Sequence, residues 1–184
     1  LEVDRIAFKE NLPPAIKACI FADNDHREIV ILTPDLQLVR VSISERTILE
    51  KLDLKTRIEE YVKSQKLTNK LRLFDTIVTA TTLTADTVVL SLAMPLTLII
   101  TKETIRHVCS KPVLTSTITE SALLLSHPGS KITYYSLPDL TPTQVEIPKM
   151  PVITSLHALS TNFLAISPHA MTVLDPSQAQ DGEA

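Results

Sequence analysis

The chain has 184 residues, of which 44% are hydrophobic and 21% are charged, and its formal net charge is −3. This composition is typical of a globular domain, and the charge excludes a strong overall attraction to nucleic acid or acidic lipid. The two cysteines, Cys19 and Cys109, form no disulfide framework and favour a reducing, intracellular compartment. The chain opens on Leu1 rather than Met, and we expect it to be part of a longer protein.

Glycine is rare in this chain, since Gly129 and Gly182 are its two occurrences. Phosphate-binding loops need several glycines at fixed spacing, so that the backbone can approach the phosphates. The sequence therefore excludes Walker-type nucleotidases and Rossmann dinucleotide binders. Much of the turn chemistry is assigned instead to the 12 prolines.

Residues 16–44 have the composition and spacing of strands. The apolar run 29–32 is followed by a turn at Thr33-Pro34-Asp35, and apolar residues then alternate over 36–43 with one slip of phase. A β-bulge is one physical cause of such a slip. We interpret this segment as a β-hairpin.

The hydrophobic period becomes helical after Ser44. This change predicts a single helix over residues 44–67, inserted between strands, with Ser44 as its N-cap. Its apolar stripe consists of Ile48, Leu52, Ile58, Tyr61 and Val62. Because the sheets have enough apolar residues to fill their own core, we expect this stripe to contact a protein partner.

A modest basic run lies at the end of this helix. It consists of Lys63, Lys66, Lys70 and Arg72. Contacts with the phosphates of RNA are one interpretation. A solvated connector is the favoured one, because aromatic residues make up only 4% of the chain and offer few platforms for base stacking.

Short strands dominate the rest of the chain, from Leu71 to Leu174. They recur every eight to ten residues and are separated by turn signals such as His127-Pro128-Gly129. Such even spacing is typical of an antiparallel sandwich, barrel or propeller. We therefore predict one mainly-β domain over residues 1–174, followed by a disordered acidic tail over 175–184.

Four stretches share an apolar run, a small turn and a second apolar run. They are REIVILTPDLQLVRVSI, DTVVLSLAMPLTLIIT, SALLLSHPGSKITYYSL and NFLAISPHAMTVLD. Here the chain resembles degenerate β-propellers of the WD40-like group, over residues 71–175 and more weakly over 16–44. The turn Ser136–Leu140 is similar to outer-hairpin turns in propellers of vesicle-tethering, nuclear-pore and nucleolar assembly subunits.

The resemblance implies a partial β-propeller with one inserted helix, and a β-sandwich is the alternative. It also implies a non-enzymatic scaffold subunit of a large complex, of a ribosome-assembly, other nuclear or vesicle-tethering type. The alternatives are a hydrolase or lyase on a propeller scaffold, and an assembly factor that contacts RNA. The expected compartment is intracellular, in the nucleus, the nucleolus or the cytoplasm.

Side chains that could take part in catalysis or bind a metal are few and scattered. His107 and Cys109 share one face of a predicted strand, but two ligands leave a zinc site incomplete. The cluster of Asp23, Asp25 and His26 is better explained as a solvated turn than as an acid–base or metal site. We therefore predict no catalytic residue, no cofactor and no metal, and no apolar run is long enough to span a bilayer.

Overall fold

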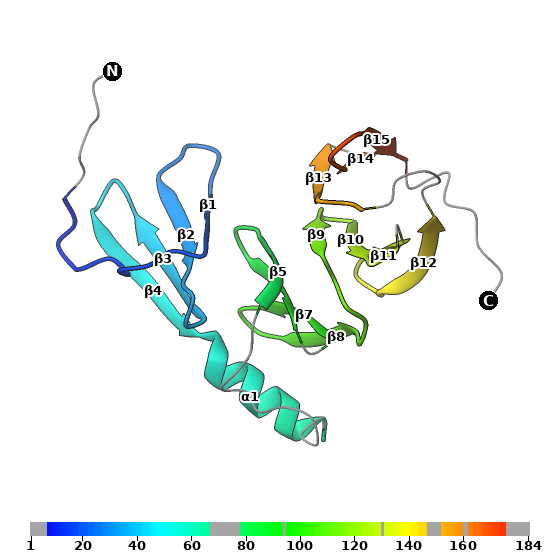
Figure 1. The fold of residues 1–184 in the computed structure, drawn as a ribbon. Coiled ribbons are helices and arrows are strands. Elements are labelled where there is room, and N and C mark those ends of the chain that lie inside the picture. The colour runs from blue at the N-terminus through cyan, green and yellow to red at the C-terminus, as the bar shows by residue number, and fades with distance from the viewer. Residues whose placement is uncertain are drawn as a thin grey trace. The chain divides into compact units, whose positions relative to one another are not determined.

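A computed structural model describes residues 7–66, 78–93, 95–129, 131–146, 152–159 and 162–175. Within these ranges the chain forms four antiparallel β-sheets and one α-helix (Figure 1). The mainly-β class predicted from the sequence is confirmed. Within the described residues, no helix is long and apolar enough to cross a bilayer.

Each sheet is built from strands that are consecutive in the chain. Sheet 1 contains β1 (Ala18–Phe21), β2 (Glu28–Leu32), β3 (Gln37–Ser42) and β4 (Thr47–Asp53). Sheet 2 contains β5 (Val78–Leu83), β6 (Thr87–Leu92), β7 (Leu96–Thr101) and β8 (Ile105–Cys109). Sheet 3 contains β9 (Thr115–Ile118), β10 (Ala122–His127), β11 (Lys131–Ser136) and β12 (Thr141–Glu146). Sheet 4 contains β13 (Ser155–Leu159), β14 (Asn162–Ile166) and β15 (Met171–Leu174).

The chain divides into two compact units. Unit 1 comprises residues 1–73, 83–87 and 101–105, and unit 2 comprises residues 74–82, 88–100 and 106–184. Unit 1 therefore holds sheet 1, the helix and two turns of sheet 2. Unit 2 holds most of sheet 2 together with sheets 3 and 4.

Sheet 1 has its own apolar cluster. Ile31, Val39 and Val41 are buried together on one face of the sheet, which we call the outer face of sheet 1. Val30 and Leu32 alternate with Ile31 along β2 and are buried as well, so β2 is covered on both faces. The register of β3 against β4 shifts between Arg40 and Val41, where Leu49 of β4 has no opposite residue, so the bulge lies on β4 and not within the predicted segment 36–43.

The helix is shorter than predicted. It is α1 (Leu54–Ser64), and residues 47–53, which were assigned to the helix, form strand β4 and pair with β3. Ile48 and Leu52 are four residues apart, which fits one face of a helix. On β4 they pair with Val41 and Leu38 and lie on opposite faces, because Leu49 between them has no partner in the pairing. The expectation of a helix from Ser44 is therefore wrong, because pairing with β3 makes this segment a strand.

Asp53 marks the true start of α1. Its Oδ1 accepts a hydrogen bond from the backbone N of Thr56 at 3.1 Å, and Oδ2 accepts one from the Thr56 hydroxyl at 2.8 Å. These two bonds hold the pKa of the Asp53 carboxyl below its usual value. The N-cap is therefore Asp53 and not Ser44.

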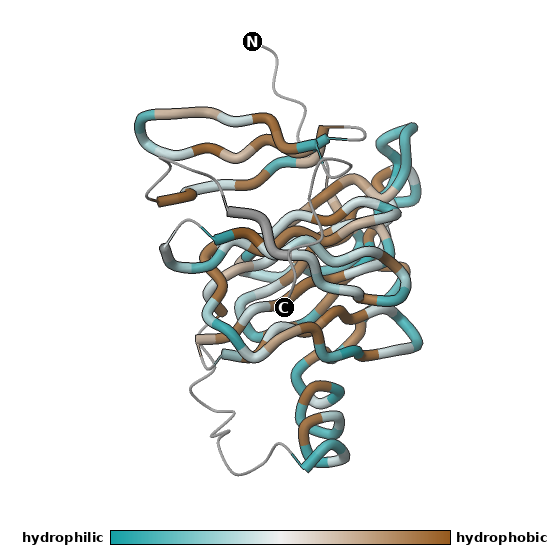
Figure 2. The backbone as a smooth tube through the Cα atoms, turned by 90° about the vertical axis from the view of Figure 1, so that its right-hand side faces the viewer, coloured by the Kyte–Doolittle hydropathy of each residue, from teal (hydrophilic) through white to brown (hydrophobic). Residues whose placement is uncertain are grey.

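Sheet 3 is covered on both faces. On one face Leu123, Leu125 and Tyr135 are buried against a residue from each strand of sheet 2, namely Ala80, Val89, Ile99 and Cys109. On the other face Ala122, Leu124 and Ile132 are buried against Leu156, Phe163 and Ala165 of sheet 4. Strand β10 thus directs alternate side chains into two separate cores, and the tube in Figure 2 shows apolar residues along the strands and polar ones at the turns.

Hydroxyl groups close several turns in this glycine-poor chain. In each, the backbone N of a Thr or Ser donates to the carbonyl three residues on, and its Oγ accepts from that residue's N. The turns begin at Thr84, Thr101, Thr119 and Ser167. The first three contain no proline, so side-chain hydroxyls share the turn chemistry with the prolines. A short side-chain hydroxyl bonds its own backbone and stabilises a turn without glycine.

The turn Ser136–Leu140, which resembles an outer-hairpin turn in the sequence, joins β11 to β12 in a hairpin. Strands β11 and β12 pair from Lys131 with Glu146 to Ser136 with Thr141. Strand β12 is at the edge of sheet 3, as expected for a strand that contains Pro142. Residues 176–184 of the predicted acidic tail lie outside the described ranges.

Candidate functional site

An extended segment, residues 8–17, lies across the outer face of sheet 1, and we call it the strap. Phe8 packs against the cluster of Ile31, Val39 and Val41. The backbone N of Lys9 donates to the carbonyl of Arg46 at 3.0 Å, and that of Lys17 donates to the carbonyl of Leu32 at 2.8 Å. The strap is therefore fixed at both ends, at the β3–β4 turn and at the end of β2.

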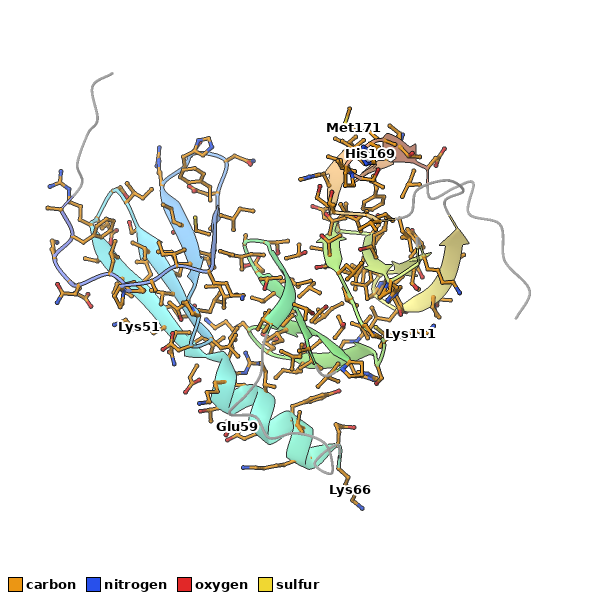
Figure 3. All side chains as sticks on the ribbon, viewed as in Figure 1. Lys51, Glu59, Lys66, Lys111, His169 and Met171 are labelled. Carbon is orange, nitrogen blue, oxygen red and sulfur yellow. The ribbon has the colours of Figure 1, made fainter. Side chains whose placement is uncertain are left out.

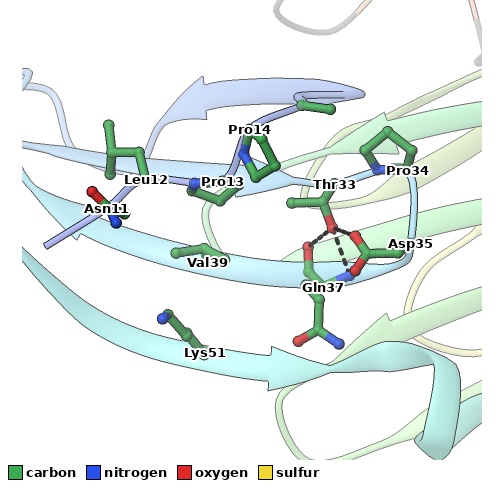
Figure 4. Close-up of a pocket in the computed structure, with 11 residues that line it drawn as sticks. Asn11, Leu12, Pro13, Pro14, Thr33, Pro34, Asp35, Gln37, Val39 and Lys51 are labelled. Atoms are coloured by element: carbon green, nitrogen blue, oxygen red, sulfur yellow. Dashed lines mark hydrogen bonds between the residues drawn. The ribbon is translucent and has the colours of Figure 1, made fainter.

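A cavity of about 640 Å³ lies beneath the middle of the strap (Figure 4). Its lining comes from the strap, from the β2–β3 turn and from the facing strands β3 and β4. The residues are Asn11, Leu12, Pro13, Pro14, Ala15, Thr33, Pro34, Asp35, Gln37, Val39 and Lys51. The volume falls in the range of about 300–1,000 Å³ that is common for ligand sites.

The polar groups of the cavity are arranged by the β2–β3 turn. Thr33 Oγ1 lies 2.5 Å from Asp35 Oδ1 and accepts from the backbone N of Gln37 at 2.9 Å. The Asp35 carboxylate is thereby held to its own turn. Lys51 projects from β4 on the opposite side (Figure 4). The cavity thus combines apolar walls with the Lys51 ammonium group and with the Asp35 carboxylate, which is bonded to its own turn. The ammonium group suits an extended apolar segment that carries an acidic group.

The stripe predicted to bind a partner does not exist as one surface. Ile48 and Leu52 lie on β4, whereas Ile58, Tyr61 and Val62 lie on α1. Ile58 and Val62 are 1% and 0% exposed, and Tyr61 is half-buried. Ile58 and Val62 are therefore buried within the chain, and contact of the predicted stripe with a partner stays a prediction.

The basic run is described in part. Lys63 and Lys66 are exposed at the end of α1, and Figure 3 shows Lys66 extending away from the helix. Lys70 and Arg72 lie outside the described residues. Contacts of this run with phosphate therefore stay a prediction.

His107 and Cys109 do not form a site together. The Nε2 of His107 lies 3.0 Å from the Oγ of Ser110 on the exposed side, whereas Cys109 is buried and belongs to the core between sheets 2 and 3. The described residues contain no group of three His, Cys, Asp or Glu side chains that could hold a metal ion.

The cluster at the β1–β2 turn has a structural role. Asp23 Oδ1 accepts hydrogen bonds from the backbone N of Arg27 at 2.9 Å and of Glu28 at 3.0 Å. The ring of His26 makes an edge-on contact with the ring of Phe21, with centroids 4.4 Å apart. The interpretation of Asp23, Asp25 and His26 as a turn stabilised by aspartate is confirmed.

His127 is a buried polar residue that sequence reasoning did not select. Its Nδ1 lies 2.8 Å from the carbonyl oxygen of Pro112, and its Nε2 lies 2.9 Å from the hydroxyl of Thr133. Burial lowers the pKa of His127, the hydrogen bond to Pro112 raises it, and the charge of Lys111 lowers it further. The strap cavity was missed as well, because the sequence does not show which sheet face an irregular segment covers.

Comparisons with known proteins identify the fold and no family. No family model matches the chain, and no curated protein matches it. A computationally designed protein, Ika4, has 12% identity and a TM-score of 0.56, and the match covers 95% of this chain and 99% of that one. A chain in the structure of S. cerevisiae Dbp5 bound to Nup159, Gle1, IP6 and ADP has 12% identity and a TM-score of 0.54. That match covers 90% of this chain, which spans 46% of the other chain's length.

Proposed function

We propose that this chain is a non-enzymatic scaffold that binds other proteins, and that its sheets are blades of an incomplete, degenerate β-propeller. The observation that carries the proposal is sheet 3, whose two faces are buried against sheet 2 and against sheet 4. In a β-propeller each blade is a four-stranded meander, and consecutive blades pack face to face in chain order.

The first strands of neighbouring sheets support a radial arrangement within unit 2. Thr82 of β5 and Ser116 of β9 bring their hydroxyl oxygens within 2.6 Å of each other. Strand β9 in turn contacts β13. In a propeller the first strand of each blade lies nearest the axis, and first strands of adjacent blades are therefore neighbours.

Several polar side chains that could act in catalysis instead form hydrogen bonds that stabilise the fold of the described ranges. His127 bonds Pro112 and Thr133, Asp23 and Asp53 bond backbone N–H groups, and the Cys109 thiol bonds the Tyr135 hydroxyl. A group that is committed to the fold is poorly placed to act as a nucleophile or a base. This use of the groups favours a scaffold over a hydrolase or lyase.

We assign the strap cavity to a segment of a partner protein. Leu12 is exposed beside it, and Val39 and the prolines of the strap supply apolar walls. Lys51 supplies the positive charge that would select an acidic group on that segment. The partner could belong to a ribosome-assembly or other nuclear complex, or to a vesicle-tethering complex.

Quantitative co-purification tests the proposal. The intact chain should recover a stoichiometric set of proteins, and Lys51→Glu should reduce that recovery about tenfold or more. The control is Lys63→Glu, an equal change of charge on α1 and away from the cavity. Equal recovery by wild type and Lys51→Glu would contradict the assignment of the cavity. A loss of recovery with Lys63→Glu that depends on RNA would favour the RNA-contacting alternative.

A further inference from the structure

Sheet 4 has one covered face and one apolar face that remains exposed. Pairing between strands puts Ile166 beside Met171 and Leu164 beside Val173, and it puts Asn162 beside Leu159. We call this surface the free face of sheet 4. Its residues are Ser155, His157, Leu159, Asn162, Leu164, Ile166, Met171 and Val173.

The free face exposes much apolar surface. Met171 is 72% exposed, Val173 is 58% exposed and Leu159 is 44% exposed. Figure 3 shows Met171 pointing outward from the outer strand of the sheet, and Leu164 and Ile166 are half-buried beside it. A contiguous apolar face of this kind is typical of a protein–protein contact.

The neighbouring interface shows what kind of surface covers such a face. Sheet 3 has apolar side chains on both faces, and each face is covered by another β-sheet. Strands β14 and β15 have the same two-faced pattern, because Phe163 and Leu174 point towards sheet 3 while Leu164 and Val173 point away. Because the free face continues this pattern, we expect it to pack against the apolar face of a further β-sheet.

We infer that the cover is the same free face of a second copy of this chain, in a symmetric dimer. The free face contains no Asp, Glu, Lys or Arg, so two copies meet without repulsion between like charges. The outer face of sheet 1, which is the other candidate within a second copy, is already crossed by the strap, and Phe8 packs on its apolar cluster. A contact of one surface with itself gives a closed two-fold dimer, the commonest symmetry of oligomers.

The size of the face predicts a weak dimer. Three strands about 4.8 Å apart and about five residues long present a small surface, below the roughly 800 Å² per partner of a standard interface. The dimer should therefore depend on concentration. This inference rests on sheet 4 alone and is independent of the proposed function.

Analytical ultracentrifugation of the whole chain, from about 10 µM to about 1 mM, tests the inference. Wild type should shift from monomer to dimer, and the double variant Met171→Lys, Val173→Lys should raise the dissociation constant at least about tenfold. The control is Leu114→Lys, because Leu114 is 45% exposed in unit 2 but outside the free face. Circular dichroism melting of all the variants checks that they are folded.

A wild type that stays monomeric up to about 1 mM would overturn the inference, and so would a dimer that the double variant leaves intact. Cross-linking of a Val173→Cys variant with a short bis-maleimide identifies the contact. A link between Cys residues at position 173 of two copies supports the symmetric dimer. A link from position 173 to Cys19, which is exposed on β1, would show that sheet 1 is the counterpart and would overturn the symmetric arrangement.

Discussion

The Nε2 of His127 and the hydroxyl of Thr133 lie 2.9 Å apart, and both side chains are buried in sheet 3. The Nδ1 of the same ring faces the carbonyl of Pro112, which can only accept, so Nδ1 carries the proton and donates. Nε2 is then the acceptor, and Thr133 donates to it. The neutral ring is fully satisfied, whereas protonation of Nε2 would reverse this bond and place a positive charge in a buried site.

This arrangement predicts that the chain loses stability in mild acid. Burial holds the pKa of His127 below the ordinary value of 6.5, so the unfolded chain binds a proton more readily than the folded one. The free energy of unfolding should be constant above about pH 6.5 and should fall between that pH and the lower folded pKa. Urea denaturation at a series of pH values measures it.

The matched variant is His127→Gln, which keeps an amide to bond Pro112 and Thr133 but does not titrate in this range. Its stability should be lower overall and flatter between about pH 7 and about pH 5. An equal slope in the variant and in wild type would show that His127 is not the group responsible.

The two cysteines should differ sharply in reactivity. Cys19 is exposed on β1, whereas Cys109 is 8% exposed and its thiol bonds the buried hydroxyl of Tyr135, whose pKa is raised chiefly by burial. A thiol reagent should modify one cysteine in the folded chain and two in denaturant. A Cys19→Ser variant should show no fast reaction, and rapid modification of that variant would contradict the burial of Cys109.

The sequence predicted the strand content well because period-two alternation and turn signals are local. It failed between Ile48 and Leu52, where a spacing of four residues fits a helix face. The long-range pairing with β3 makes this segment a strand instead, and a bulge at Leu49 puts the two side chains on opposite faces. The strap cavity could not be predicted, since it depends on Phe8 reaching the cluster around Val39. The alternation of side chains from Met171 to Leu174 indicates a strand with two different faces, but only the pairing of the strands shows which face is covered.

We expect the free energy of unfolding to fall when one of the turns closed by a hydroxyl group loses its side-chain oxygen. Thr119 Oγ1 accepts from the backbone N of Ala122 at 3.1 Å, and Ala122 is buried. Thr119→Val keeps the shape of the side chain and leaves that N–H without its acceptor, which should cost about 1–3 kcal/mol of unfolding free energy. Thr119→Ser retains the oxygen and should cost much less. Equal losses in the two variants would mean that packing, and not the hydrogen bond, stabilises the turn.

The buried side of α1 gives the last prediction. Leu54, Ile58 and Val62 are all buried, and the Nη1 of Arg57 donates to the carbonyl of Thr101 at 2.9 Å within unit 1. The helix therefore belongs to the core of its unit, and Ile58→Ala should lower the free energy of unfolding by about 2–5 kcal/mol, as for other large buried side chains.

The control for this change is Glu60→Ala on the exposed side of α1, which should alter stability by no more than about 0.5 kcal/mol. Chemical denaturation of both variants measures the difference, and co-purification measures the binding of partners at the same time. If the Ile58→Ala chain is stable but no longer recovers its partners, the result would support the prediction that α1 binds a partner. A destabilised chain would place Ile58 in the core, because a side chain that only contacts a partner contributes nothing to the folding of the isolated chain.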